Sequence, residues 1–390
     1  MQVAAILCEY NPFHNGHRYQ IQQLKKQGYA VICLMSGNFV QRGAPAITHK
    51  WDRAAMALQN GCDLMLELPT PYALCSAEGF GRHAVELFNR TGCVDVMSFG
   101  CECGDTSLLM EGAQALLSPA FLEEVKAQMK SGASFPAARQ RAMEHHAPQL
   151  SFLLSSPNDI LGLEYCKALL QTGSPIRPLG LARHMAGHHD TSPTRQFASA
   201  SYLRELWTKG KWWQARRYTP PSAHRIMKHA QPVGPQDFSQ ALLYRLRTMT
   251  PEELSAIKDV REGLEHRILK SAQTAHDWDS LLSGISTRRY PRTTLQRILF
   301  CALLGLDDSL YQEPAYYLRV LGFTPTGAQI LKTMKETAQC PVLTKPTHYT
   351  RMDAAQQKLF LTECRCTQVY QLALPHTDLH ELKRTPIRWG

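Results

Sequence analysis

The first hundred residues alternate between short apolar runs and segments with helical spacing, and this alternation constrains the fold more than any other feature. The apolar runs predict strands at Val3–Cys8, Ala30–Met35, Asp63–Leu68 and Val94–Phe99. Residues 16–27, 50–60 and 76–89 separate them and carry helical spacing. Strands and helices alternate in this way when a parallel sheet is covered by helices on both faces. Ligands of such sheets bind beyond the carboxyl ends of the strands.

The rest of the chain is mostly helical in pattern. Residues 107–171 predict helices, residues 177–183 a fifth strand, and residues 199–206 the start of another helix. After Pro220-Pro221 the strand signals largely vanish, and residues 237–246, 251–263 and 293–304 predict amphipathic helices. A chain of 390 residues is also too long for one compact core. We therefore expect an α/β fold: a Rossmann-like parallel-sheet domain at residues 1–225, followed by a mainly α-helical C-terminal domain at residues 226–390.

The loop after the first strand carries the chemistry. His14 and His17 stand there, separated by Asn15 and Gly16, and a helix follows. Glycine lets the backbone approach a ligand closely, and a helix start offers free N–H groups and a positive dipole end to phosphates. Two imidazoles at the same place can donate hydrogen bonds to a phosphate as its charge rises during displacement. The loop therefore predicts a site that binds and splits a nucleotide.

The same two histidines have other interpretations. They could be a metal pair, although such pairs on helices more often stand four residues apart with a third ligand. They could also only cap the helix. The twelve cysteines include the C-x-C pairs Cys101/Cys103 and Cys364/Cys366 but no C-x-x-C, which favours reduced thiols over disulfides or a zinc site. We expect no metal-ligating residues.

The net charge of +10 is concentrated in one block. Residues 191–230 hold eight lysines and arginines against one acid, Glu205, and they include Trp207, Trp212, Trp213 and Tyr218. Cations for phosphates and aromatic rings for stacking are what an RNA-binding surface requires. A solvated helix whose aromatic face packs inward has the same composition. Both interpretations stay open on composition alone.

Several segments together resemble a known family. The H-x-G-H element resembles the signature of the nucleotidylyltransferase superfamily, shared with class I aminoacyl-tRNA synthetases. A closer resemblance, over nearly the whole chain, is to the bacterial tRNA(Met) cytidine acetate ligase family. It rests on Glu9-Tyr-Asn-Pro-Phe-His-Asn-Gly-His17, Met35-Ser-Gly-Asn-Phe-Val-Gln-Arg-Gly43, Glu67-Leu-Pro69, Phe99-Gly-Cys-Glu-Cys-Gly-Asp105, Pro157-Asn-Asp-Ile-Leu-Gly162 and Arg183 with His189-Asp190.

The resemblance implies an ATP-dependent ligase. Acetate would be activated as acetyl-adenylate and transferred to N4 of the wobble cytidine, position 34, of elongator tRNA(Met), forming N4-acetylcytidine. The residues in the first domain would then form a nucleotidyltransferase-type ATP site, and Mg²⁺ is expected to bridge the phosphates. The helical domain would contribute to tRNA binding. Neither acetate nor this tRNA follows from residue spacing.

The resemblance also implies residue roles. His14 and His17 would be catalytic and contact the phosphates. The ATP site would comprise Leu7, Cys8, Glu9, Tyr10, Asn11, Pro12, Phe13, His14, Asn15, Gly16, His17, Arg18, Tyr19, Gln20, Gly100, Asn158, Arg183 and His184. From the basic block, Lys209, Lys211, Arg216 and Arg217 are the candidates for RNA contact. Two features depart from the family pattern: the segment Phe197–Ser201 before Arg204 only partly matches its second phosphate-binding helix start, and Cys101 stands where serine is more common.

Two rival functions share some of these features. An adenylyltransferase acting on a phosphorylated small molecule would have the same loop but would need no RNA-binding surface. A non-catalytic RNA-binding protein could keep the nucleotide fold for its shape. The sequence has no signal peptide pattern and no apolar run of the ~18 to 20 residues that a membrane span needs. We therefore expect a cytoplasmic protein with ATP, acetate and tRNA as partners, no membrane and no stable protein partner.

Overall fold

A largely parallel sheet forms the centre of the molecule. The computed structural model describes residues 1–182, 196–261, 263–287, 289–374, 377–378 and 380–390. The strands of the sheet are β1 (Val3–Cys8), β2 (Ala30–Ser36), β5 (Leu64–Leu68), β6 (Val96–Cys101), β7 (Arg177–Ala182), β8 (Leu318–Phe323), β9 (Val342–Leu343) and β10 (Ile387–Arg388). Their order is β10-β8-β5-β2-β1-β6-β7, with β9 beside β8. The pairing of β5 with β8 is antiparallel and the other pairings are parallel.

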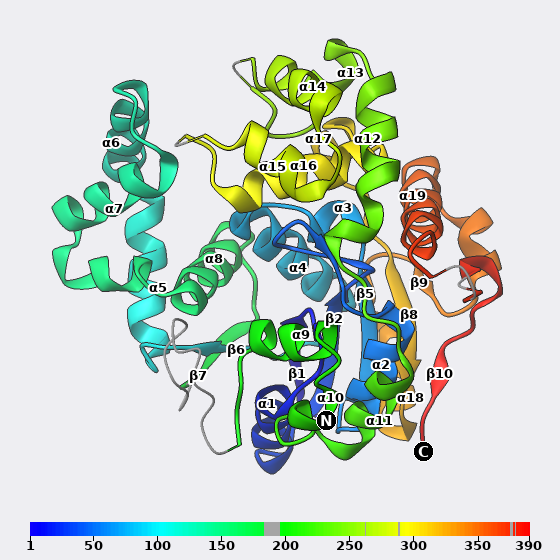
Figure 1. Cartoon of the computed structure of the whole chain (residues 1–390). Helices are drawn as coiled ribbons and strands as arrows, with labels where there is room; N and C mark the ends of the chain where they lie inside the picture. Colours follow the sequence, from blue (N-terminus) through cyan, green and yellow to red (C-terminus); the bar gives the residue numbers. More distant parts are fainter. Residues whose placement is uncertain (183–195, 262, 288, 375–376, 379) are drawn as a thin grey trace.

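Helices cover both faces of this sheet, as the alternation of strands and helices predicts (Figure 1). Ala4 and Ile6 of β1 belong to a buried cluster that also contains Leu24 of the helix after β1. Val3 and Ala5 of the same strand belong to the second buried cluster, on the other face. Successive side chains of a strand point to opposite faces, so both faces of β1 are apolar because both are covered.

Helices occur along the whole described chain. They are α1 (Asn15–Lys26), α2 (Lys50–Leu58), α3 (Thr70–Ala73), α4 (Ala77–Thr91), α5 (Thr106–Leu117), α6 (Pro119–Lys130), α7 (Phe135–His146), α8 (Pro157–Gln171), α9 (Ala200–Thr208), α10 (Trp212–Ala215), α11 (Pro221–His229), α12 (Ser239–Thr248), α13 (Pro251–Ser255), α14 (Leu264–Thr274), α15 (Trp278–Ile285), α16 (Arg292–Leu304), α17 (Ser309–Gln312), α18 (Pro325–Thr337) and α19 (Ala354–Gln371). Short 3₁₀ turns lie at Pro148–Leu154, Pro235–Phe238, Pro346–Arg351 and Glu381–Lys383. None of the helices described is long and apolar enough to cross a membrane.

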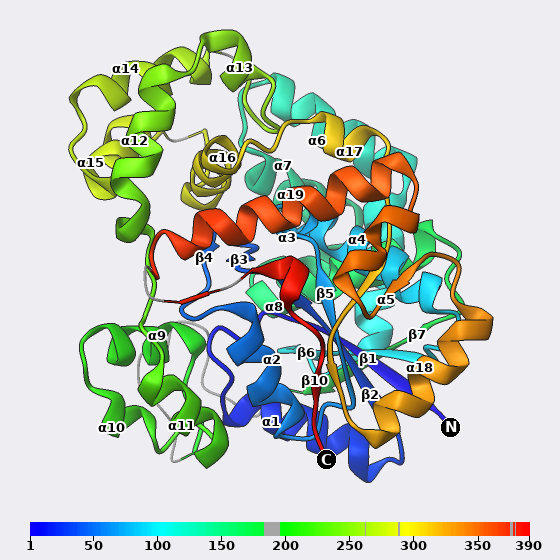
Figure 2. The same cartoon turned by 90° about the vertical axis from the view of Figure 1, so that its right-hand side faces the viewer.

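Three groups of helices stand away from the sheet. In Figure 1, α6 and α7 project on one side, α12 to α16 form the top of the molecule, and α9 to α11 lie at the opposite end. Figure 2 shows α19 running across the molecule between the top helices and the sheet. A two-stranded antiparallel hairpin, β3 (Phe39–Val40) with β4 (Ala44–Pro45), lies under the top helices.

The C-terminal part of the chain completes the sheet, which the sequence pattern did not predict. β8, β9 and β10 all come from residues after 226, and β8 pairs with β5. The predicted division after residue 225 is therefore not a division of the sheet, although most of the later chain is helical. The predicted helix at residues 251–263 is wrong in its second half. It ends at Ser255, and Asp259 has a φ of 70°, which a continuing helix cannot adopt.

Candidate active site

The sheet reverses its strand order between β1 and β6. From β1, the chain order runs outward through β2 and β5 on one side and through β6 and β7 on the other. The pairing of β1 with β6 covers only Ala4 with Val96 and Ala5 with Met97. Continuing this register places Gly100 across from Cys8, beyond the last paired residues. In an open α/β sheet, the crevice at such a switch point is where a ligand binds.

The loop that leaves β1 at this point is fixed by contacts from distant segments. Asn11 Oδ1 accepts the backbone N–H of Ile47 at 2.7 Å, and the Asn11 carbonyl accepts Nη1 of Arg204 at 2.8 Å. The Asn11–Pro12 peptide is cis, and Tyr10 has a φ of 47°. Asn11 and Pro12 are buried. Residues 47 and 204, far from the loop in sequence, thus both hold Asn11.

The two histidines of the loop lie against each other. Their rings are stacked, with centroids 3.6 Å apart and an interplanar angle of 21°. Nδ1 of His14 accepts the backbone N–H of Gly16 at 3.0 Å, and Nδ1 of His17 accepts the backbone N–H of His14 at 3.3 Å. A neutral imidazole that accepts at Nδ1 carries its proton on Nε2. The backbone thus orients both neutral rings with the proton on Nε2.

His14 does cap the helix that follows, and this changes one expectation. Its side chain accepts from Gly16, while the Asn15 N–H donates to the Tyr218 carbonyl at 2.9 Å. Two of the amides that we expected to be free for phosphates at the start of α1 are therefore already used. The capping interpretation and the phosphate interpretation are compatible, because capping uses Nδ1 of His14 and phosphate binding would use Nε2.

A second helix start lies against the same loop. Ser199 caps α9 by accepting the Tyr202 N–H at 3.2 Å, and Arg204 of α9 donates to the Asn11 carbonyl. Nη2 of Arg204 also donates to Ser201 Oγ at 3.1 Å. The segment before Arg204, which only partly matches the family pattern, is thus brought to the loop by the fold, and Arg204 is the residue that joins them.

Asn158 and Gly100 come from the neighbouring strand end. Gly100 is half-buried in β6, and the Asn158 side chain donates to the Glu102 carboxylate just after that strand. The Asp159 N–H donates to the same carboxylate at 3.1 Å. The N-cap of α8 is Ser156, so Asn158 lies inside the first turn and is not the N-cap of that helix. A role of Asn158 and Gly100 in ATP binding stays a prediction.

The remaining predicted loop residues differ in exposure. Gln20 links α1 to β6, since its side-chain amide donates to the Ser98 carbonyl at 3.2 Å. Arg18 and Tyr19 are exposed, and Tyr10 and Phe13 are buried with ring centroids 4.8 Å apart. Leu7, Cys8 and Glu9 form the end of β1 and the start of the loop. Arg183 and His184 lie outside the described residues.

Arg53 is a site residue that sequence reasoning missed. It lies fully buried on α2, and its Nη1 donates to the carbonyls of Glu9 at 2.6 Å and Ser36 at 3.2 Å. Glu9 Oε1 in turn accepts the Gln41 N–H at 2.8 Å. Arg53 thereby ties the ends of β1 and β2 together. The only sequence signal was an arginine among the small apolar residues of this helix.

Two groups of side chains among the described residues could hold a metal ion, and neither includes the histidine pair of the loop. One is Cys101, Cys103 and Asp159, and the other is Glu124, His145 and His146. All twelve cysteines are free thiols. The described residues thus give no third ligand to the metal-pair interpretation of His14 and His17.

Known proteins resemble this chain over nearly its whole length. The family model described as HIGH Nucleotidyl Transferase matches residues 1–385. The tRNA(Met) cytidine acetate ligase of Alkaliphilus metalliredigens is 36% identical over 96% of this chain and 95% of the relative. The protein of the same name from Caldicellulosiruptor saccharolyticus is 37% identical over 99% of this chain and 98% of the relative.

The chain belongs to the tRNA(Met) cytidine acetate ligase family, within the HIGH nucleotidyl transferases. A crystal structure of Thermotoga maritima TmcAL, apo form I, superposes with a TM-score of 0.94 at 29% identity, covering 100% of this chain and 99% of that chain. A second crystal structure of the same protein, bound with alpha-thio ATP, gives a TM-score of 0.91 over the same shares. The resemblance found in the sequence and the α/β nucleotidyltransferase fold are confirmed.

The basic block of this ligase family member is divided between core and surface. Trp207 and Tyr218 are buried, as the solvated-helix interpretation predicts. Trp212 and Trp213 are exposed by 41% and 63%, so part of each ring is accessible to a ligand. Lys228 Nζ lies 5.0 Å from the Trp212 ring centroid. The four cations predicted to contact RNA, Lys209, Lys211, Arg216 and Arg217, are all exposed. Each interpretation therefore describes part of the block.

Proposed function

We propose that this protein is an ATP-dependent ligase that activates acetate as acetyl-adenylate and then acetylates N4 of the wobble cytidine, position 34, of elongator tRNA(Met). The product is N4-acetylcytidine. The observation that carries the proposal is the stacked pair His14 and His17 at the switch point, with both Nδ1 atoms held by backbone N–H groups. The names of the relatives supply the acetate and the tRNA.

The first step needs no nucleophile from the protein. Acetate is already an anion, so one of its oxygens attacks the α-phosphorus without a general base. The bond from the α-phosphorus to the bridging oxygen breaks, and pyrophosphate leaves with the added negative charge. His14 and His17 donate from Nε2 to the phosphate oxygens as that charge develops, because their rings are already oriented.

In the second step the cytosine amino nitrogen attacks the acetyl carbonyl carbon. The carbonyl–oxygen bond to the phosphate breaks, AMP leaves, and the amino group loses a proton. The other residues that we assign to the ATP site would contact ATP or the acetyl-adenylate during this reaction. We assign Gly100 to the adenosine, Asn158 to an ATP contact, and Arg183 and His184 to the phosphates or the acetyl-adenylate.

Mg²⁺ is part of the proposal as a partner of ATP. Protein-bound Mg²⁺ with nucleotides is held mostly by the phosphates and by one or two carboxylates. Glu9 is the carboxylate of the loop itself, and one of its oxygens accepts the Gln41 N–H. The Glu9 carboxylate therefore fits a cation that binds together with the ATP phosphates. Mg²⁺ held there would neutralise charge on the leaving pyrophosphate.

Two surfaces support the RNA part of the proposal. Lys211, Arg216 and Arg217 lie beside exposed tryptophans near the loop, since the Arg217 carbonyl accepts the Asn15 side-chain amide at 3.1 Å. In the helical part after residue 226, a hollow of about 470 Å³ is lined by cationic side chains and a tyrosine, among them Arg267, Lys270 and Arg289. Cations that follow a phosphate backbone give sequence-independent affinity. We propose that residues 226–390 contribute to tRNA binding through this hollow.

The setting follows from the substrates. We propose that the ligase acts in the cytoplasm, where tRNA and ATP are present, without a membrane and without a stable protein partner.

One incubation tests the proposed function. Purified protein receives ATP, labelled acetate and total bacterial tRNA, with the His17→Ala variant as the matched control. Label in tRNA, located in N4-acetylcytidine and absent from the variant, supports the ligase. Adenylate formation without labelled tRNA would support an adenylyltransferase of small molecules. No adenylate and no labelled tRNA would support a non-catalytic RNA-binding protein.

A further inference from the structure

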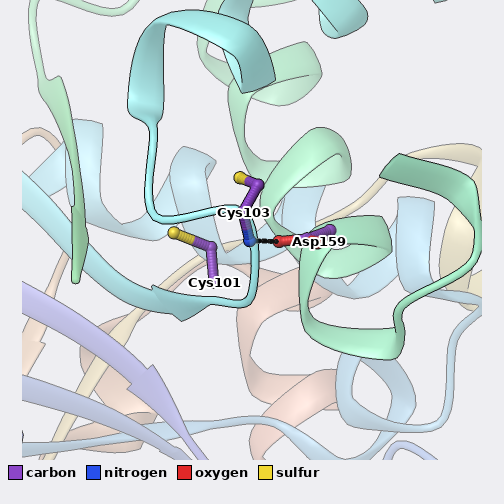
Figure 3. Close-up of side chains that lie close together, drawn as sticks. All are labelled: Cys101, Cys103 and Asp159. Carbon is purple, nitrogen blue, oxygen red and sulfur yellow. Dashed lines mark hydrogen bonds between the residues drawn. The ribbon is translucent and has the colours of Figure 1, made fainter. Parts of the chain in front are cut away.

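The C-x-C pair at the end of β6 has a use that the ligase reaction does not assign. Cys101 is the last residue of β6, Cys103 follows in the turn, and Asp159 lies in the first turn of α8. The two sulfur atoms and a carboxylate oxygen of Asp159 all lie within 4.8 Å of one another. Figure 3 shows the three side chains gathered around the turn. We propose that Cys101, Cys103 and Asp159 form a binding site for a thiophilic divalent cation of the Zn²⁺ class.

The turn is built so that the carboxylate is already in place. Oδ1 of Asp159 accepts the backbone N–H groups of Glu102 at 2.8 Å and Cys103 at 3.1 Å. The Glu102 carboxylate in return accepts the N–H of Asp159 and the side chain of Asn158. A carboxylate has acceptor positions on both oxygens, so these two bonds fix its orientation and leave capacity for a cation. Outer contacts of this kind are what orient metal ligands in proteins.

The charge around the three side chains also suits a cation. Asp159 and Cys101 are buried, with exposed fractions of 1% and 0%, and Cys103 is half-buried. Among the residues that the structure describes, no ion pair joins a lysine or arginine to Asp159 or Glu102. A buried carboxylate without a cationic partner is costly. A bound divalent cation would remove that cost.

The chemistry of the ligands decides the class of cation. Two thiolates and one carboxylate select Zn²⁺, Co²⁺ or Cd²⁺ over Mg²⁺ and Ca²⁺, which take oxygen ligands. In a tetrahedral site the ligand atoms stand about 3.8 Å apart, because zinc–sulfur bonds are about 2.3 Å long. The three ligand atoms now lie within 4.8 Å of one another, and the two thiols donate to the carbonyls of Leu181 and Asp105, so a cation would have to draw them closer and replace these bonds. Three protein ligands leave a fourth position open.

Occupancy would act on the ATP site through the chain itself. The ligand Cys101 directly follows Gly100, and Asp159 directly follows Asn158, the two residues that we assign to ATP contacts. A cation on these ligands would lock the end of β6 to the start of α8. The function of the site is therefore to fix the wall of the ATP pocket. This last point rests on the proposed function, but the cation site does not.

Cobalt(II) titration of the reduced full-length protein tests the site. Bound thiolates give a near-ultraviolet charge-transfer band that histidine and carboxylate ligands do not give. We expect the intensity of this band to saturate at one Co²⁺ ion per protein chain. Added Zn²⁺ should displace the Co²⁺ and abolish the band. Cys103→Ser, at a half-buried position, should weaken cobalt binding at least about tenfold, a loss seen even when only an outer contact of a metal site is removed.

Two further variants separate this site from other binding. His145→Ala with His146→Ala removes the second candidate metal group, which holds no sulfur, and should leave the charge-transfer band unchanged. Cys364→Ser, at another half-buried C-x-C cysteine, should also leave it unchanged. The proposal is overturned if the wild-type protein gives no charge-transfer band, or if the band survives in the Cys101→Ser, Cys103→Ser double variant.

Discussion

At the scale of single residues, the proposed function depends on the orientation of two imidazoles. Residue type alone makes His14 and His17 candidates for phosphate contact. The fold then decides what each nitrogen can do, because backbone N–H groups occupy both Nδ1 atoms. A ring held in this way donates from Nε2 without reorganising during the reaction, which is the condition for a large electrostatic effect on the rate.

Replacing one of these rings tests that role. His17→Ala should lower acetate-dependent ATP–pyrophosphate exchange by ~10² to 10³, the usual cost of losing one preorganised donor. His145→Ala, at an exposed histidine of α7, should leave the exchange rate unchanged. Circular dichroism melting checks that both variants are folded. An exchange rate of His17→Ala close to that of the wild type would show that His17 does not act on the phosphates.

At the scale of elements, distant segments approach the site so closely that some positions admit only glycine. Gly43, in the turn between β3 and β4, has a φ of 71°, and an added Cβ would lie 2.3 Å from the backbone nitrogen of Arg297 in α16. Gly210, between α9 and α10, has a φ of 68° with no atom within 4 Å of an added Cβ. Both glycines therefore have a left-handed backbone in which an alanine would be strained. Only at Gly43 would the added methyl group also meet another segment.

This difference gives a prediction for the hairpin. Gly210→Ala should lower the free energy of unfolding by about 1 kcal/mol, the cost of the left-handed backbone alone. Gly43→Ala should cost more, about 2 to 4 kcal/mol, because α16 must also shift. Urea unfolding of the two variants measures both values. Equal losses would mean that the hairpin is not pressed against α16.

The segment around α10 gives a second prediction at this scale. Changing Lys211, Arg216 and Arg217 to Glu should weaken tRNA binding and reduce the salt slope of log K by about 2 to 3, because each phosphate contact contributes nearly one counterion. ATP binding should be unchanged. Changing the exposed Lys126, Lys332 and Lys335 to Glu alters the net charge equally and serves as the control. If both triple variants bind tRNA like the wild type, the block is only a solvated surface.

At the scale of the whole molecule, a buried charge cluster joins the two ends of the chain. Lys50 Nζ on α2 lies 2.6 Å from Glu67 of β5, 3.1 Å from Glu381 and 3.4 Å from Glu363 of α19. All four side chains are at most 3% exposed. Burial by itself would lower the pKa of Lys50, but the three carboxylates outweigh it and hold that pKa above its ordinary value. Lys50 is therefore charged at neutral pH.

Replacing Lys50 by an uncharged residue should show how much the stability of the folded protein depends on its positive charge. Lys50→Met leaves the buried carboxylates without the cation that the three share and should lower the free energy of unfolding by ~3 to 5 kcal/mol at about pH 8. Lys335→Met, on the surface of α18, should change it by less than about 0.5 kcal/mol. Guanidinium unfolding measures both variants.

The pH dependence of the Lys50→Met variant follows from the carboxylates. Burial raises the pKa of Glu67 in the folded protein, and Lys50 opposes that rise, so its removal raises the pKa further. The folded variant then binds more protons than the unfolded chain, and its stability increases as the pH falls. The deficit against the wild type should shrink between about pH 8 and about pH 5.5. A deficit that is constant with pH would mean that removing Lys50 does not change the protonation of these carboxylates in the folded protein over this range.

The strands and helices that could be predicted are those whose signal lies within their own residues. β1 and β2 are short apolar runs next to amphipathic helices, so the signal for each lies within its own residues. β8 is equally apolar, but its pairing partner β5 stands about 250 residues earlier, and it lies among helices. β10 has only two residues and becomes a strand only by pairing with β8. Local patterns contain no information about such pairings.

The site divides in the same way. The sequence by itself determined the H-x-G-H loop after the first strand, since residue type and position on a parallel sheet suffice for it. It also determined the family, through motifs spread along the whole chain. Only the tertiary structure decided that Arg204 and Arg53 hold the loop, and that Glu102 and Asp159 hold the turn beside Gly100. These contacts join residues that are far apart in the chain. Their hydrogen bonds lie in positions that are shielded from water only after the chain has folded.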